Sequence, residues 1–490
     1  MSASTFEENH SVDVKNQSIA TRLIAGTWLN WPLLLFCLFA WAGTAVLMTR
    51  AVTQLSRFNE LIVAVASGLL LAASVVLFKR WFRATPFTFT QFFTRHGLFL
   101  ALALGLILRL AWILAFPAQP SSDGMSYLIL AQKINVGEQY ELAGTLAYWP
   151  PGYAFFLAPW IRYLEPAIAV PLSQLFLFVV SIAGVHQLTI KLATRQAASC
   201  AALLFAVWPN LVAHCATPEK EMLVAALLIW AFTLVLSKRP ISYFFVGISL
   251  GAAILVQPST QFLLLPIAIL IGLKSSQKSP LAVGLLVVGA ALIVTPWTVR
   301  NYQKLDTFKL VSTNGGDNLY RANNPLATGG YTDTGAIDLS GLSELKRDDT
   351  AKILAVRWIT EHPAAFLSLM LEKQFRFMGD DAAGVYSTFR AEGSQRSNKL
   401  YFPIKLAANA WWLATWFVIA CLLLSGKKLG KAQFLVWGWI YFFTLHSVFE
   451  AAGKYHVPIL WIMCVMLGIL ISDGVNIPKA SADKPSKPLN

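Results

Sequence analysis

The chain has 490 residues, of which 56% are hydrophobic and 13% are charged, and its formal net charge is +14. Because a soluble domain carries about 25% charged residues, this composition excludes an ordinary soluble enzyme and indicates many membrane spans. The positive charge does not indicate a nucleic-acid partner, since the lysines and arginines of the short loops gather in alternate loops, as in membrane proteins. We therefore expect an all-α polytopic membrane protein.

The spans can be placed in chain order from the apolar runs. A run of about 17 to 25 apolar residues is long enough to cross the hydrocarbon core of a bilayer. The sequence predicts about twelve transmembrane helices, and the one at 261–273 is the shortest. They lie at about 32–49, 61–79, 97–117, 167–190, 196–214, 221–237, 241–256, 261–273, 280–297, 403–425, 432–449 and 455–473.

These spans divide the chain into six parts. The two ends, 1–30 and 474–490, are polar tails, and the second has the Lys-, Pro- and Ser-rich composition of a disordered segment. Between them we expect two extra N-terminal spans with a basic inner loop at 31–96, a membrane core at 97–297 that includes a first outer loop at 118–166, a long outer loop at 298–402, and C-terminal spans at 403–473.

The basic loops also set the predicted orientation. If the N-terminus is cytoplasmic, the loops rich in lysine and arginine are cytoplasmic too, as the positive-inside rule requires. Both termini then lie on the cytoplasmic side of the inner membrane, and both large loops lie on its periplasmic side. The aromatic run at 150–164 is too short to span, so we expect a juxtamembrane helix in the interface. Amphipathic spacing at 345–378 predicts helices that pack on the membrane core.

A short polar segment follows the third span and holds an acid, Asp123. Tyr127 comes four positions later, so the two side chains share one face if the segment is helical. The run Trp-Pro-Pro-Gly-Tyr at 149–153 follows before the aromatic helix. We hypothesise that Asp123 is a catalytic base at the outer membrane surface. The alternative is a solvated loop acid beside the start of a helix.

Other charged residues lie at the outer ends of several spans. Arg109 lies inside the third span, where a cation is costly and faces a polar cavity, a structural partner or the interface. Glu219 and Glu221 flank Lys220 at the outer start of a span. Their alternative role is that of helix N-terminal acids favoured by the helix dipole.

Two more groups of polar residues lie at later outer turns. Arg300 lies in the string TPWTVRNY at 295–302, where a span meets the long loop, and its alternative role is an interfacial anchor. A second group at the last outer turn could be explained by an ion pair or by snorkelling alone. It consists of Glu450, Lys454, Tyr455 and His456. The sequence holds no metal motif of specific spacing, so no metal ligand set is predicted.

Taken in order, these strings resemble membrane glycosyltransferases of the GT-C fold. Asp123 followed by Tyr127 and Pro-Pro-Gly-Tyr is similar to the bacterial protein O-mannosyltransferase-like and lipid A aminoarabinose-transferase-like proteins of glycosyltransferase families 39 and 83. The match departs from the family at Trp149, where a basic or polar residue is usual, and at Lys454, where arginine is usual. The other strings of the resemblance are Lys220-Glu221, TPWTVRNY, STNGGDNLYRANNP at 312–325 and EAAGKYHVP at 450–458.

The resemblance implies a hexosyl or pentosyl transferase with a polyprenyl-phosphate-linked sugar donor. The sugar would pass to an acceptor hydroxyl on a glycan, lipid or protein by a single inverting displacement. Asp123 would be the base, and Glu221 would position the acceptor or assist, although Glu219 remains open as the second acid. A divalent cation, Mg²⁺ or Mn²⁺, at Asp123 and Glu221 is also left open, because carboxylate oxygens suit both ions. The implied substrate-binding residues are Tyr127, Arg109, Glu219, Lys220, Arg300, Asn301, Tyr302, Lys454 and Tyr455.

Two other functions share parts of this pattern. A transporter or lipid flippase also has many spans and buried charges, but it predicts internal repeats and paired broken helices, and the sequence shows no clear repeat. An O-antigen ligase or polymerase also uses lipid-linked donors and is expected to rely on arginine and histidine in a large outer loop. In the long loop predicted here, His362 is the only histidine.

Overall fold

The computed structural model describes residues 26–53, 56–84, 90–117, 120, 122–237, 239–274, 279–332, 337–390 and 398–472. Within these ranges every regular element is a helix, apart from one isolated bridge between Leu142 and Thr145. The expected all-α class is therefore confirmed. The predicted polar tails lie outside the described residues, except for residues 26–30 at the end of the first tail.

Seven helices in the described part of the chain are long and apolar enough to cross a membrane. Two of them, α2 and α20, are extended by the short 3₁₀ helices η1 (Thr27–Leu29) and η5 (Gly453–Ile459). The chain is thus a multi-pass membrane protein. The seven are α2 (Asn30–Val52), α3 (Arg57–Ala84), α4 (Gln91–Ala115), α7 (Pro166–Leu192), α13 (Ser279–Leu305), α18 (Asn398–Leu424) and α20 (Leu460–Ile471).

The other five predicted spans also coincide with helices, but these are bent or shorter. One is bent by 55° between α8 (Arg195–Val207) and α9 (Pro209–Ala213), which continues into η2 (His214–Ala216). Pro209 causes the break, because it lacks an N–H and pushes Trp208 into an extended conformation. The total of twelve spans stays a prediction. The shorter helices are α10 (Glu221–Val235), α11 (Ile241–Val256), η3 with α12 (Pro258–Leu263 and Leu264–Lys274), and η4 with α19 (Gly430–Leu435 and Val436–Val448).

The two large loops are also helical. The first contains α5 (Ser122–Val136) and α6 (Gly152–Ile161), and the ten residues of α6 reach about 15 Å, half of a bilayer core, as a non-spanning helix should. The amphipathic stretch predicted at 345–378 is confirmed as two helices that meet at His362. The long loop consists of α14 (Gly315–Ala322), α15 (Glu344–Glu361), α16 (Pro363–Met378) and α17 (Ala383–Arg390).

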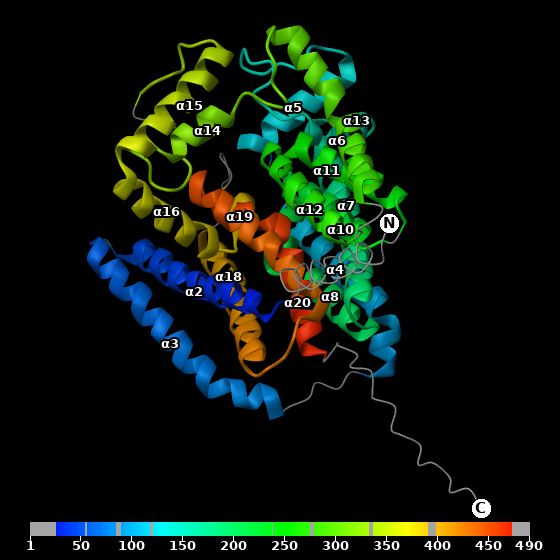
Figure 1. Cartoon of the computed structure of the whole chain (residues 1–490), viewed down its shortest axis with the longest axis vertical. Helices are drawn as coiled ribbons and strands as arrows, with labels where there is room; N and C mark the ends of the chain where they lie inside the picture. The colour runs from blue at the N-terminus through cyan, green and yellow to red at the C-terminus, as the bar shows by residue number, and fades with distance from the viewer. Residues whose placement is uncertain are drawn as a thin grey trace, which may run out of the picture.

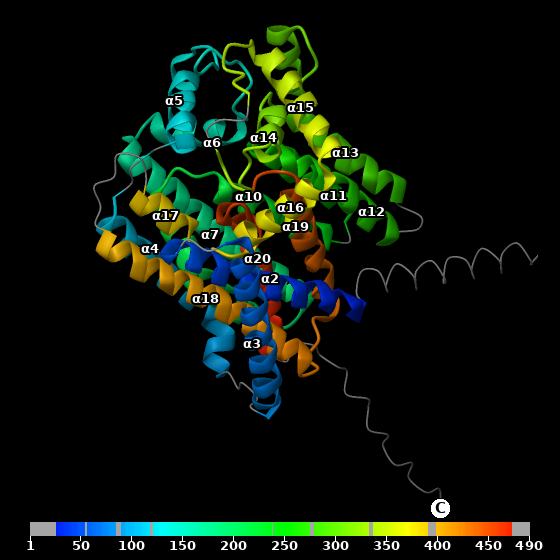
Figure 2. The same cartoon turned by 90° about the vertical axis from the view of Figure 1, so that its left-hand side faces the viewer.

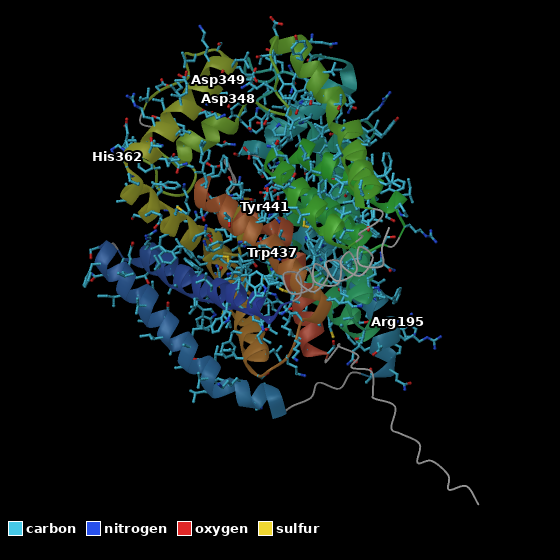
Figure 3. The ribbon with its side chains drawn as sticks, viewed as in Figure 1. Arg195, Asp348, Asp349, His362, Trp437 and Tyr441 are labelled. Carbon is cyan, nitrogen blue, oxygen red and sulfur yellow. The ribbon has the colours of Figure 1, made fainter. Side chains whose placement is uncertain are left out.

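The two large loops pack on each other at one end of the helix bundle. The carboxylate of Glu344 accepts hydrogen bonds from the backbone N–H groups of Leu146 at 2.6 Å and Ala147 at 2.8 Å, and Thr313 N–H donates to the Ala147 carbonyl at 3.0 Å. Helices α5, α14 and α15 accordingly lie together at the top of both views (Figures 1 and 2). Asp349 on α15 and Arg195 at the start of α8 lie toward opposite ends of the molecule (Figure 3).

The N-terminal hairpin α2–α3 packs beside α16 and α18, away from the first loop (Figure 1). Arg50 at the end of α2 joins the hairpin to the long loop. Its guanidinium donates to Glu60 of α3 at 2.6 Å and to Glu372 of α16 at 2.6 and 2.8 Å. Paired, charge-assisted hydrogen bonds of this kind fix geometry as well as supplying energy.

Candidate functional site

Helix α5 presents Asp123 in its first turn. Ser122 has a φ of +47°, in the left-handed region that is costly for a residue other than glycine, and such strain gathers at functional sites. Tyr127 lies one turn later, as the spacing predicts, and is fully buried. Its ring meets Trp149 and Tyr153 edge-on, with centroid distances of 5.6 and 5.4 Å. The Trp-Pro-Pro-Gly-Tyr run thus anchors α5 while the Asp123 side chain stays 48% exposed.

The same run also holds the turn at 217–220 in place. Gly152 allows α6 to approach the end of α11, because a Cβ here would lie 2.7 Å from the backbone of Leu255. The buried amide of Gln174 on α7 then donates to the Tyr153 hydroxyl at 3.1 Å and to the carbonyls of Thr217 and Glu219 at 3.2 and 2.9 Å. The segment that carries Glu219, Lys220 and Glu221 is therefore fixed beside α6.

Three cations surround Asp123. Lys454 of η5 places Nζ 3.6 Å from Asp123 Oδ2, and Lys220 Nζ lies 5.7 Å from the centre of the Tyr127 ring. Partial burial acts to raise the pKa of Asp123, but the charges of Lys454, Lys220 and Arg321 outweigh it and hold this pKa below its usual value. Asp123 is therefore a carboxylate at neutral pH, with segments from three other parts of the chain around it.

Arg321 of α14 is the cation that sequence reasoning did not single out. Its Nε lies 4.0 Å from Glu450 Oε2, and the Tyr455 hydroxyl donates to Glu450 Oε1 at 2.6 Å. Burial lowers the pKa of Arg321, but Tyr148 and nearby acids including Glu450 raise it more, so it stays charged. The only signal in the sequence was its position within STNGGDNLYRANNP.

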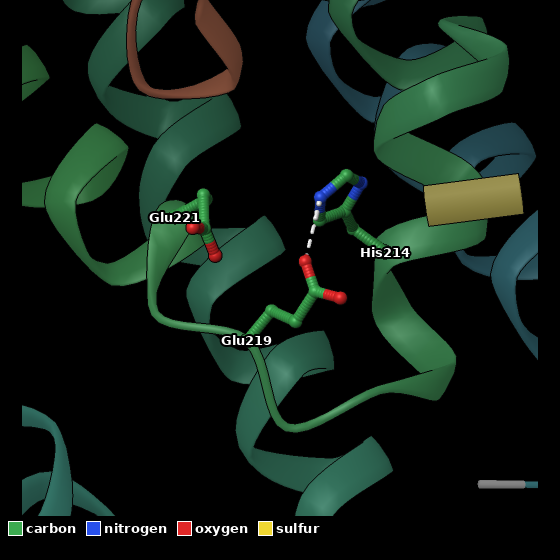
Figure 4. Close-up of side chains that lie close together, drawn as sticks. All are labelled: His214, Glu219 and Glu221. Atoms are coloured by element: carbon green, nitrogen blue, oxygen red, sulfur yellow. Dashed lines mark ion pairs between the residues drawn. The ribbon is translucent and has the colours of Figure 1, made fainter. Parts of the chain in front are cut away.

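The second pair of acids lies next to this cluster, together with a histidine. Glu219 Oε2 is 3.3 Å from His214 Nε2, and Glu221, the first residue of α10, is 4% exposed (Figure 4). Burial raises the pKa of Glu219, but His214 and Lys454 lower it more, which favours the carboxylate. His214 was not among the residues expected at the site, because it stands alone near the end of a predicted span.

The predicted phosphate ligand Arg300 lies elsewhere. Its Nη1 donates to the Leu146 carbonyl at 2.7 Å and its Nη2 to the Tyr140 carbonyl at 2.9 Å, and the guanidinium lies 4.6 Å from the Trp297 ring. These contacts tie α13 to the first loop. No contact among the described residues joins Arg300 to Asp123, and the anchoring alternative fits the geometry.

Three other residues that the resemblance implied as substrate ligands form no hydrogen bond or ion pair with Asp123 within the described part of the chain. Arg109 is 1% exposed, donates to the carbonyls of Gly105 at 3.1 Å and Ala206 at 2.8 Å, and lies 3.7 Å from the centre of the Phe178 ring. Asn301 is buried and donates to two carbonyls of the following turn, and Tyr302 is 57% exposed. The contacts of Arg109 and Asn301 are with main-chain carbonyls, and helix α13 continues through Asn301 and Tyr302.

Comparison with known proteins gives structural matches only. No protein-family model matches the chain, and no curated protein matches it. The structure is similar to the Archaeoglobus fulgidus oligosaccharyltransferase in the apo form, with a TM-score of 0.47, 13% identity, and coverage of 77% of this chain and 50% of that one. The archaeal oligosaccharyltransferase AglB in complex with an inhibitory peptide and a dolichol-phosphate gives 0.45 and 12%, covering 78% of this chain and 50% of that one.

A further similar structure is ArnT from Cupriavidus metallidurans bound to undecaprenyl phosphate, with a TM-score of 0.37, 12% identity, and coverage of 76% of this chain and 77% of that one. The chain spans about half the length of the oligosaccharyltransferase. These matches agree with the resemblance to GT-C glycosyltransferases that the motifs predict. Because each TM-score is below 0.5, only the residues of the site itself bear on the function.

Proposed function

We propose that the protein is a membrane glycosyltransferase that moves a sugar from a polyprenyl-phosphate-linked donor to an acceptor hydroxyl. One observation carries this proposal. Asp123 is a half-exposed carboxylate with Lys454 at 3.6 Å, and Lys220 and Arg321 act on it from two further segments. A base surrounded by cations is the arrangement that transfer from a phosphate leaving group requires.

The chemistry assigns a separate task to each charge. Asp123 accepts the proton of the acceptor hydroxyl while that oxygen forms a bond to the anomeric carbon of the sugar. The bond between this carbon and the phosphate oxygen breaks, and the lipid phosphate leaves with the electron pair. A single displacement of this kind inverts the anomeric centre. The leaving phosphate gains negative charge, so cations placed in advance lower the barrier.

We assign the phosphate to Lys454, Lys220 and Arg321. Lys454 is 37% exposed, and Arg321 Nε is buried, 4.0 Å from Glu450 Oε2, with no hydrogen-bond partner among the described residues. The two terminal nitrogens of Arg300 already donate to carbonyls, which leaves that residue a positioning role. Glu221, beside this cluster, is proposed to position the acceptor. The acceptor would be a glycan, a lipid or a protein.

Sugar transfer can be measured directly with the purified protein in proteoliposomes. Radiolabelled sugars on dolichol-phosphate and on undecaprenyl phosphate serve as donors, against the matching lipid diphosphates. We expect transfer from a monophosphate and a loss of about 10²- to 10⁴-fold in Asp123→Asn. Glu138→Gln, which changes an acid with a 61% exposed side chain just after α5, is the matched control. A folded Asp123→Asn protein with wild-type turnover, or wild type that uses no lipid monophosphate, would refute the proposal.

We also propose that the site faces the periplasm, with both termini in the cytoplasm. The five cysteines are all buried, so single cysteines can be introduced as reporters. Asp349→Cys and Arg195→Cys change exposed residues toward opposite ends of the molecule (Figure 3). In intact spheroplasts a membrane-impermeant maleimide should label Asp349→Cys, whereas Arg195→Cys should react only after permeabilisation. The reverse labelling would invert the topology.

A further inference from the structure

Three acceptor atoms face one another at the start of α10. They are His214 Nε2, a carboxylate oxygen of Glu219 and a carboxylate oxygen of Glu221, and all lie within 4.8 Å of one another (Figure 4). His214 comes from η2, at the end of the bent span, Glu219 comes from the turn that follows, and Glu221 is the first residue of α10. This group is separate from the pairing of Asp123 with Lys454.

The orientation of the His214 ring shows what the group lacks. His214 Nδ1 lies 2.9 Å from the Asn210 carbonyl, which can only accept, so Nδ1 carries the proton. In the neutral ring Nε2 is then an acceptor, and it faces another acceptor, Glu219 Oε2, at 3.3 Å. Both atoms are buried, and neither makes a hydrogen bond with any described residue. Two buried, unpaired acceptors in contact are costly unless a positive charge lies between them.

The surroundings hold the His214 ring in this position. Asn210 accepts the Gly384 N–H at 2.8 Å and donates its side-chain amide to Asp381. Gly384 allows α17 to pack directly on the ring, because a Cβ at this position would lie 2.4 Å from His214 Nδ1. A backbone carbonyl that binds the distal ring nitrogen is the usual outer support of a metal-binding histidine.

We propose that His214, Glu219 and Glu221 bind a divalent cation of the first transition row, in the class of Mn²⁺ and Zn²⁺. One imidazole nitrogen and two carboxylate oxygens suit these ions, whereas Ca²⁺ prefers oxygen alone. Ligands about 2.1 Å from a tetrahedral ion lie about 3.4 Å apart, close to the 3.3 Å between His214 and Glu219. Three protein ligands leave at least one position open for water or substrate.

A proton on Nε2 would also fill the gap between His214 and Glu219, as a simple ion pair. That alternative involves only His214 and Glu219, whereas a metal ion uses all three residues. The cation site does not depend on glycosyl transfer. If both exist, the bound ion adds positive charge next to Lys220, because its ligands Glu219 and Glu221 flank Lys220 in the sequence.

Metal binding can be measured without any activity assay. The full-length protein, purified in detergent and stripped with EDTA, is titrated with Mn²⁺ and followed by electron paramagnetic resonance, with Zn²⁺ as competitor. We expect one Mn²⁺ per chain, displaced by Zn²⁺, and nitrogen modulation from one imidazole in the pulsed spectrum. Affinity should fall at least tenfold in Glu219→Gln and Glu221→Gln, and the nitrogen signal should disappear in His214→Gln.

His362→Gln, which changes an exposed histidine of the long loop, is the matched control and should bind like the wild type. Size-exclusion profiles and circular dichroism confirm folding of each variant. If His214→Gln does not fold, the two glutamine variants still decide the question, because each keeps the shape of the side chain it replaces. Absence of binding in the wild type at millimolar Mn²⁺, or equal affinity in the wild type and the carboxylate variants, would show that the group is an ion pair only.

Discussion

Lys454 and His456 lie two residues apart on η5 and pair with acids in opposite environments. Lys454 lies 3.6 Å from Asp123, and both side chains are partly exposed. His456 lies 3.1 Å from Asp381, and both side chains are completely buried. In sequence the two cations look alike. In the first pair, Lys454 can exchange Asp123 for a ligand. In the second pair, the side chains are buried and no ligand can reach them.

The buried pair is fully satisfied. His456 Nδ1 donates to the Phe377 carbonyl at 2.6 Å, its Nε2 faces Asp381, and the ring stacks on Trp412 at a centroid distance of 4.7 Å. Asp381 also accepts the indole N–H of Trp208 at 2.7 Å. Both ring nitrogens of His456 therefore face acceptors, and Asp381 lies among donors. The comparison teaches that the fixed His456–Asp381 pair can hold η5, and with it the neighbouring Lys454, in place.

The largest expected effect comes from breaking the buried pair. Asp381→Ala leaves the buried side chains of His456, Trp208 and Asn210 without their shared acceptor and should lower the free energy of unfolding by about 3–5 kcal/mol. Thermal unfolding in detergent, followed by tryptophan fluorescence, measures this loss. Asp349→Ala, which removes an aspartate with a 67% exposed side chain, should change little. Equal melting temperatures for the two variants would mean that the buried pair contributes nothing to stability.

The cluster of cations around Asp123 should respond in catalysis instead. Arg321→Ala removes a guanidinium assigned to the phosphate of the sugar donor. It should raise the KM for the lipid-linked sugar donor about 10- to 100-fold, with little change in the KM for the acceptor. Steady-state transfer kinetics with each substrate varied in turn measures this difference. Arg357→Ala, a change at a 70% exposed arginine of α15, is the control. A larger effect on the acceptor than on the donor would remove Arg321 from the phosphate site.

Arg300 should behave like the buried pair and not like the cluster. Arg300→Ala leaves the carbonyls of Leu146 and Tyr140 without their donor and should cost about 1–3 kcal/mol of stability. The KM values for donor and acceptor should change by the same factor, if at all. A selective loss of donor binding in a stable protein would restore the phosphate role that the sequence suggested for Arg300.

The smallest effect concerns pH. Because neighbouring cations hold the pKa of Asp123 below its usual value, the carboxylate base is lost only as the pH falls through this lowered pKa. The acid limb of the kcat/KM profile should therefore lie below the pKa of a free aspartate. Lys454→Met removes the nearest cation and should move this limb to higher pH. A limb that stays in place would show that Lys454 does not act on Asp123.

The sequence predicted helices better than it predicted partners. All twelve apolar runs coincide with helices, because a run of apolar residues is a local property of the chain. The bend at Pro209 was missed inside the run at 196–214, although proline was the available signal. Asp123 and Lys454 were both selected from motifs, yet their 3.6 Å contact joins residues 331 positions apart (454 − 123), which no spacing rule encodes.

The partners of Arg300, Arg321 and His214 could not be predicted for the same reason. Arg300 and Arg321 stand in neighbouring motifs and carry the same charge, but packing assigns one to main-chain carbonyls and the other to the cluster. His214 gave no signal, because it lies on η2, whereas Glu219 lies in the following turn and Glu221 begins α10. Only the tertiary structure decides which charges remain available, so the candidate site could be outlined from the sequence but not completed.

Arg50 has a consequence for biosynthesis. Its partner Glu372 lies 322 residues further along the chain, so the ribosome has delivered most of the protein before this contact can form. Until then Arg50 has only Glu60, within its own hairpin. The hairpin α2–α3 therefore gains this link to α16 only after α16 has been made.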